Sequence, residues 1–130
     1  MATVTPAWTE NQSLTAFDDT SPADGVTAKT TLDLDAAGPY DMVIVQLKIT
    51  WHASATDYAD IILYASPDSG TTDDTKALWS QRIYPTAGAT DYISIIIKDI
   101  PFANIWVKNQ TNQEIAEVSG KYAGRKWSSA

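Results

Sequence analysis

The sequence predicts an all-β protein, a single antiparallel β-sandwich of jelly-roll or immunoglobulin-like type with about eight short strands. Three observations favour this fold class. Apolar and polar residues alternate with a period of two in several segments, and clusters of turn-forming residues separate these segments. No segment has a sustained helical period. The 130 residues suffice for one such domain with a single core.

The clearest strand candidate is Tyr40–Trp51, where large apolar side chains occupy every second position of one face. Tyr58–Ala65 and Asp91–Ile100 are rich in β-branched and aromatic residues, which favour strands. Weaker strand candidates cover residues 10–17, 29–34, 77–84, 103–110 and 114–122. The residues that we expect in the core are Val43, Val45, Leu47, Ile49, Ile61, Leu63, Ile93, Ile95 and Ile97.

Composition divides the chain into residues 1–25, an N-terminal arm or edge segment, and residues 26–130, the sandwich domain. The first segment is rich in Thr and has three large apolar side chains, those of Trp8, Leu14 and Phe17. Three such groups are too few for a local core, so we expect them to dock elsewhere. The docking place is either a neighbouring subunit or an edge of the same domain.

Charge and composition exclude several classes of partner. A net charge of −7, with nine scattered basic residues, offers no positive surface for a phosphate backbone, so nucleic acid is not an expected partner. The absence of cysteine excludes disulfides and thiolate chemistry. The N-terminus lacks the features of a secretory signal, and no stretch approaches the roughly 20 apolar residues of a membrane span. We therefore expect a protein that is made in the cytoplasm, stays soluble and has no membrane partner.

Residues that support catalysis are few. The single histidine, His52, stands at the end of a predicted strand without a serine motif such as G-x-S-x-G. Most carboxylates lie in predicted turns, where they cap the backbone. Asp68, Asp73 and Asp74 offer the oxygen ligands that calcium binds, but their spacing differs from the EF-hand pattern, so a plain hairpin loop is favoured. We predict no enzyme and no catalytic, cofactor or metal site.

Large apolar side chains also occur at positions of opposite parity to the predicted core. If both faces of a sheet are apolar, the second face needs a cover, which another subunit can provide. Aromatic residues on a sandwich can instead stack on sugar rings, which is the alternative interpretation. The residues of this predicted interaction surface are Met42, Ile44, Tyr64, Tyr92, Ile96 and Trp106, together with Trp8, Leu14 and Phe17 of the first segment.

Three stretches of the sequence resemble small all-β virion proteins of tailed bacteriophages, particularly capsid decoration and other head- or tail-associated proteins. They are YDMVIVQLKITW (40–51), YADIILYASPDSGTTDDT (58–75) and DYISIIIKDIPFANIWVKNQTNQEIAEVSGKY (91–122). In that group one strand ends in a Tyr-x-Ser-x-Asp-Gly type phrase before a long loop, and a later strand ends in Asn near a polar turn. The matching residues here are Tyr64, Ser66, Asp68 and Gly70, and the segment Val107–Asn112. Pro67 and Ser69 depart from the pattern and alter the turn.

The resemblance implies a non-enzymatic protein that assembles on a virion lattice in the host cytoplasm. It implies binding to the major capsid protein or other virion proteins, where a decoration protein stabilises the head between capsid subunits. It also implies a homo-oligomer, often a trimer, and the first segment would then lie on a neighbouring subunit or the capsid surface with Trp8 as an anchor. The alternatives are a tail or neck component and, in another class, a carbohydrate- or receptor-binding module.

Overall fold

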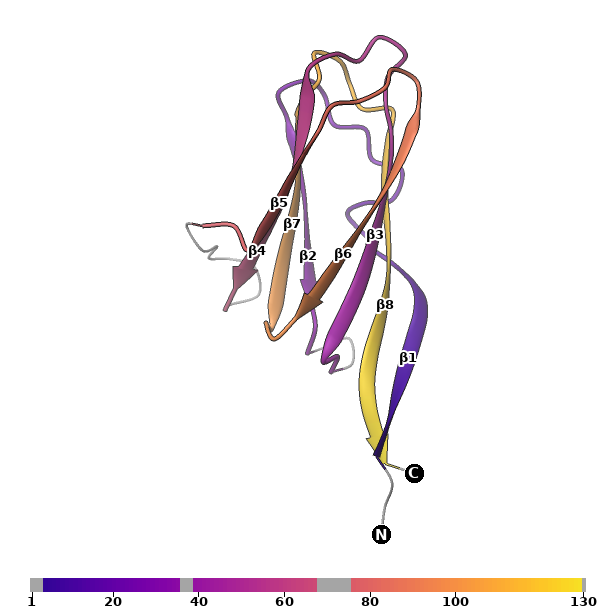
Figure 1. Ribbon diagram of the computed structural model, residues 1–130, viewed down its shortest axis with the longest axis vertical. Coiled ribbons are helices and arrows are strands. Elements are labelled where there is room, and N and C mark those ends of the chain that lie inside the picture. The colour runs from indigo at the N-terminus through magenta and orange to yellow at the C-terminus, as the bar shows by residue number, and fades with distance from the viewer. Residues whose placement is uncertain (1–3, 36–38, 68–75, 130) are drawn as a thin grey trace.

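Eight strands form two four-stranded antiparallel sheets in residues 4–35, 39–67 and 76–129, the parts of the chain that the computed structural model describes (Figure 1). No helix long and apolar enough to cross a bilayer occurs in these ranges. The strands are β1 (Val4–Ser13), β2 (Thr27–Asp33), β3 (Met42–Thr50), β4 (Tyr58–Ser66), β5 (Trp79–Ile83), β6 (Thr90–Lys98), β7 (Phe102–Gln110) and β8 (Glu117–Ser129). The predicted all-β sandwich is confirmed.

The order of the strands identifies the type of sandwich. Sheet A has the order β1-β8-β3-β6, and sheet B has the order β2-β7-β4-β5. The first strand therefore pairs with the last, the second with the seventh, the third with the sixth and the fourth with the fifth. Eight strands in two sheets with these Greek-key connections form a jelly roll, whereas immunoglobulin constant domains divide seven strands differently. Of the two predicted arrangements, the chain adopts the jelly roll.

The core lies between the two sheets and consists of the alternate side chains that the sequence pattern indicates. All nine residues of the predicted core are buried, and Val43, Val45 and Leu47 have no exposed surface. Trp51 closes one end of this core, and its Nε1 donates a hydrogen bond of 2.7 Å to Asp91 Oδ2. The period of two in these strands therefore reflects one buried face and one outer face in each sheet.

The N-terminal segment belongs to the sandwich of its own chain. β1 pairs with β8 at the edge of sheet A, and Leu14 and Phe17 are only 3% and 1% exposed inside the core. The prediction of an arm that docks Leu14 and Phe17 on a neighbouring subunit is therefore wrong. The backbone bonds from Leu14 to Gly120 (3.0 Å) and from Gly120 to Phe17 (2.8 Å) hold this segment against β8.

The limits of the first and last strands also differ from the sequence prediction. The strand expected over residues 10–17 lies at Val4–Ser13, with a shift in register between Thr9 and Gln12. The strand expected over residues 114–122 continues to Ser129 as part of β8. Both errors concern strand limits in β1 and β8, the first and last strands, which pair with each other.

Candidate protein-binding surface

Three exposed apolar side chains on the outer face of sheet A form what we call the apolar patch. Ile96 and Ile44 lie side by side, and Tyr92 lies beyond Ser94 and Gln46 on the same face. Tyr92 is 62% exposed and Ile96 is 64% exposed, although both belong to β6, whose inward side chains are fully in the core. Ile44 of β3 is directly opposite Ile96 and is 36% exposed. These β-branched and aromatic residues favour strands, but their burial requires a partner outside the chain.

Polar and charged side chains surround this patch. Lys48 pairs with Glu117 (Nζ–Oε1, 3.4 Å), and Ser119 donates a hydrogen bond of 2.8 Å to the same carboxylate. The hydrogen bond from Ser119, followed by the pairing with Lys48, lowers the pKa of Glu117. On the other side, Met42 lies between Lys98 and Arg125 in the register of the sheet. An apolar centre with a polar rim is typical of a protein–protein interface.

Trp8 lies on the same sheet but at its opposite edge. It is 41% exposed, and the guanidinium carbon of Arg125 lies 5.9 Å from its ring centroid. Arg125 in turn forms two hydrogen bonds with Asp41 (3.2 and 2.8 Å), and this contact raises the pKa of Arg125. The predicted surface residue Trp8 is therefore partly exposed to a partner. Its ring also contacts Arg125 of its own chain.

Sheet B presents a different outer face, where Tyr64 and Trp106 lie. The rings of Tyr64 and Trp106 are in contact at 4.8 Å between centroids, and the ammonium group of Lys29 lies 4.1 Å from the Trp106 centroid. Such a cation–π contact occupies a face of the indole. The six outer-face residues predicted from strand parity are thus divided between two surfaces, since the sequence does not show which sheet each strand joins.

A second aromatic group on sheet B involves Tyr58 and Arg82. The Arg82 guanidinium lies 3.7 Å from the centroid of the Tyr58 ring and forms two hydrogen bonds with Asp60 (2.9 and 3.1 Å). The hydrogen bond with Asp60 is the main cause of the raised pKa of Arg82. Tyr84 is in edge contact with Tyr58 and is 71% exposed. Tyr84 was not among the predicted surface residues, although it ends the strand expected over residues 77–84; in the structure it follows the last residue of β5, Ile83.

The residues considered for catalysis have structural contacts. His52 Nδ1 accepts a hydrogen bond of 3.0 Å from the Ser54 amide and so stabilises the turn after β3. Within the described ranges, no group of three or more His, Cys, Asp or Glu residues could hold a metal ion. The predicted hairpin loop with Asp68, Asp73 and Asp74 lies outside the residues that the structure describes.

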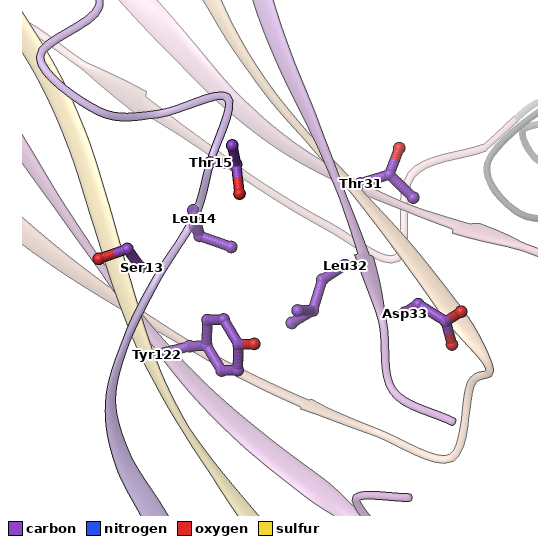
Figure 2. A pocket seen from close by; sticks show the side chains of 7 residues that line it. All are labelled: Ser13, Leu14, Thr15, Thr31, Leu32, Asp33 and Tyr122. Carbon is purple, nitrogen blue, oxygen red and sulfur yellow. The ribbon is translucent and has the colours of Figure 1, made fainter. Parts of the chain in front are cut away.

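A shallow depression of about 330 Å³ opens between the sheets beside β1 and β2 (Figure 2). The Tyr122 ring projects into it, and Leu14, Leu32 and Asp33 lie around it. Burial, followed by the neighbouring Tyr40, raises the pKa of Tyr122. Asp33 is the one carboxylate of this lining, and its Oδ1 accepts a hydrogen bond of 2.9 Å from the Asp35 amide. The depression therefore lacks the pair of carboxylates that glycoside hydrolysis requires.

No protein-family model and no curated protein sequence matches the chain significantly. Among solved structures, part of dimeric latent PorU from Porphyromonas gingivalis is similar, with a TM-score of 0.50, 11% identity and coverage of 96% of this chain and 13% of that chain. The disulfide-linked pili of Bacillus endospore appendages give a TM-score of 0.49, with 12% identity over 95% of this chain and 89% of that chain. The infectious bursal disease virus Gx strain gives 0.48, with 15% identity over 95% and 32%. At this low identity, the likeness to PorU shows a similarity of fold alone.

Proposed function

We propose that this chain is a non-enzymatic structural protein of a virion, and specifically a capsid decoration protein of a tailed bacteriophage. The observation that carries the proposal is the apolar patch of Tyr92, Ile96 and Ile44 on a regular sheet face. A surface of this kind binds protein rather than transforming a small molecule. The resemblance of residues 40–122 to phage virion proteins supports a virion as the assembly to which this surface binds. Jelly rolls are also frequent among viral capsid proteins.

The partners in this proposal are the major capsid protein or other virion proteins, together with further copies of the chain. Burying one Ile or Tyr side chain contributes roughly 1.5 to 3 kcal/mol, so the patch gives each copy a modest affinity. Many copies on one lattice act together, because each bound copy holds its neighbours close to their own sites. A decoration protein would in this way brace the joints between capsid subunits. A tail or neck component would use the same surface on another lattice.

The non-catalytic role rests on the contacts of the residues that could do chemistry. His52 supports a turn, Asp60 pairs with Arg82, and Asp41 pairs with Arg125. In the described ranges, every buried side-chain nitrogen and oxygen atom has a hydrogen-bond partner. A catalytic site needs a nucleophile, an acid or a base within reach of one another in a pocket, and these contacts instead support the fold.

The proposal is tested on particles from cells that make the chain. Virions purified by density gradient are expected to contain the chain in a fixed ratio to the major capsid protein, as measured by mass spectrometry. A cryo-EM map of these particles should then show the sandwich on the capsid exterior. Absence of the chain from purified virions would contradict the virion role, and its presence only in tails would replace decoration by the tail alternative.

A matched pair of variants tests the binding surface. Ile96→Lys places a charge in the apolar patch, and Tyr84→Lys places the same charge at an exposed aromatic position beyond sheet B. Co-sedimentation with particles that lack the chain should fall at least tenfold for Ile96→Lys and remain unchanged for Tyr84→Lys. Equal binding by both variants would show that the outer face of sheet A is not the contact surface.

A further inference from the structure

The outermost strand of sheet A, β6, has a free backbone edge. β6 pairs with β3 along its full length, and among the described residues no strand lies on its other side. The Trp51 amide donates a hydrogen bond of 2.9 Å to the Ala89 carbonyl, one step beyond the last residue pair of this ladder. Because bonded pairs alternate in an antiparallel ladder, the odd-numbered residues of β6 bond to β3. The N–H and C=O groups of its even-numbered residues therefore point away from the sheet.

Within the described residues, no backbone hydrogen bond reaches these outward groups. The other three edge strands, β1, β2 and β5, have features that discourage pairing with another chain. β2 carries the exposed Lys29 within its seven residues. β1 contains an irregularity between Thr9 and Gln12, and β5 is only five residues long, with Arg82 near its centre. β6 is nine residues long with continuous register, and its charged residues, Asp91 and Lys98, stand near its two ends.

The free edge and the apolar patch form one surface. The same even-numbered residues that direct their backbone groups outward place Tyr92 and Ile96 on the outer face, where both side chains are mostly exposed. A strand that added to this edge would thus gain backbone hydrogen bonds and cover apolar side chains at once. The composition of the edge also indicates which strand fits.

We infer that a second copy of this chain pairs with this edge, β6 against β6 in antiparallel orientation, with Ser94 on the two-fold axis. This register places each Tyr92 directly opposite Ile96 of the second copy, and aromatic with β-branched residues form favourable cross-strand pairs. It also places Thr90 opposite Lys98, so no charge faces a like charge on the outer face. The sequence of β6 is therefore complementary to itself.

A neighbouring register is disfavoured by charge. Centring the two-fold axis on Ile95 would place Asp91 opposite Asp99 of the second copy, and like charges directly opposite each other destabilise a sheet. Centring on Ser94 avoids this pair and matches every outer-face residue from Thr90 to Lys98 with a partner. The resulting contact is isologous and closes after two copies. The contact builds a dimer with a continuous eight-stranded sheet, whereas the resemblance implies a trimer. The inference of a dimer does not depend on a virion role.

Single cysteines test this register, since the chain has none of its own. Residues of a hydrogen-bonded antiparallel pair have Cα atoms about 5.5 Å apart, within the range of a disulfide. Ser94→Cys should therefore form a disulfide-linked dimer under mild oxidation. Thr90→Cys is the matched control on the same strand and face, because two such residues would lie about 27 Å apart in this register. Non-reducing electrophoresis should show at least tenfold more dimer for Ser94→Cys.

Light scattering after size exclusion tests the free edge itself. The wild-type mass should rise with concentration towards twice 14.1 kDa. Ser94→Pro removes an outward N–H that β3 does not use, so the variant should fold but remain at the monomer mass. Ile96→Lys alters the outer face and leaves the backbone intact, so it should also be monomeric. This second variant tests the inference even if the proline variant fails to fold. A wild-type chain that stays monomeric, a dimer that persists in both variants, or equal cross-linking of Thr90→Cys would overturn the inference.

Discussion

The ring of Tyr40 lies so close to Gly124 that a Cβ atom on Gly124 would be 2.4 Å from the Cδ1 and Cε1 atoms of the ring. Tyr40 is only 8% exposed and is in edge contact with Tyr122 at 6.3 Å between centroids. The aromatic ring thus fills the inward position of β8 that Gly124 leaves empty. This contact packs the residue that lies just before β3 against β8.

Gly124→Ala is expected to destabilise the protein, because the added methyl group has no room beside the Tyr40 ring. Overpacking of this kind costs typically about 1 to 3 kcal/mol. Urea unfolding followed by tryptophan fluorescence measures the change. Tyr40→Ala should also destabilise, but the double variant should lose less than the sum of the two, since Tyr40→Ala makes room for the methyl group. Additive losses would show that the two residues are not in contact.

The variants Leu47→Ala and Ile96→Ala compare the stability contribution of a core residue with that of a residue on the proposed binding surface. Leu47 has no exposed surface, so its truncation should lower the free energy of unfolding by about 2 to 4 kcal/mol through lost transfer energy and a cavity. Ile96 is on the outer face, and its truncation should cost less than about 1 kcal/mol. Chemical denaturation compares the two variants at a concentration where the chain is monomeric. Similar losses would mean that Ile96 is covered within the chain.

The core and the central strands could be predicted from the sequence, because Val43, Leu47 and Ile93 belong to strands with one buried and one outer face. The end of β8 could not be predicted, for a reason that the structure makes plain. Its inward positions include Gly120 and Gly124, where the space is filled by Leu14 and by Tyr40 from other parts of the chain. The apolar alternation therefore disappears from a strand that is nevertheless buried on one face.

The candidate surface was only partly predictable. Strand parity correctly placed Ile96 and Trp106 on outer faces, but it contains no information on which sheet a strand joins. The structure puts them on opposite sides of the sandwich, and the choice between jelly roll and immunoglobulin-like order likewise depends on pairings between distant segments. Phe17 was misassigned because a segment with few apolar residues looked unable to pack, whereas its large residues join a core that the other strands build.

Asn109 is a buried polar residue whose replacement should be costly. Its Nδ2 donates hydrogen bonds to the carbonyls of Pro22 (3.1 Å) and Gln113 (2.8 Å), and its Oδ1 accepts from the Thr111 amide (3.0 Å). Asn109→Ala leaves these groups without partners and should lower the free energy of unfolding by about 2 to 4 kcal/mol. Lys108→Ala, at an exposed position of the same strand, should change it by less than about 0.5 kcal/mol.

Asn109→Asp gives the same site a pH dependence. The new carboxylate would face the carbonyl oxygens of Pro22 and Gln113, which repel the charged form, so the variant should be less stable than Asn109→Ala at neutral pH. Protonation supplies an O–H donor, so the loss of stability should shrink as the pH falls. Thermal unfolding of both variants between pH 7 and pH 4, each compared with wild type, measures this difference. A constant gap across that range would contradict the assigned hydrogen bonds.

The rings of Trp106 and Tyr58 on sheet B should give no specific binding to sugars, although five tryptophans and six tyrosines would suit a carbohydrate-binding module. A stacking site needs an open ring face, and the Trp106 and Tyr58 rings each already have a cationic group against them, from Lys29 and Arg82. A glycan array measures binding directly, and Lys29→Ala, which uncovers Trp106, provides a sensitised comparison. Saturable binding of one glycan class by the wild-type chain, lost in Trp106→Ala but kept in Tyr92→Ala, would favour the carbohydrate module and move the functional surface from sheet A to sheet B.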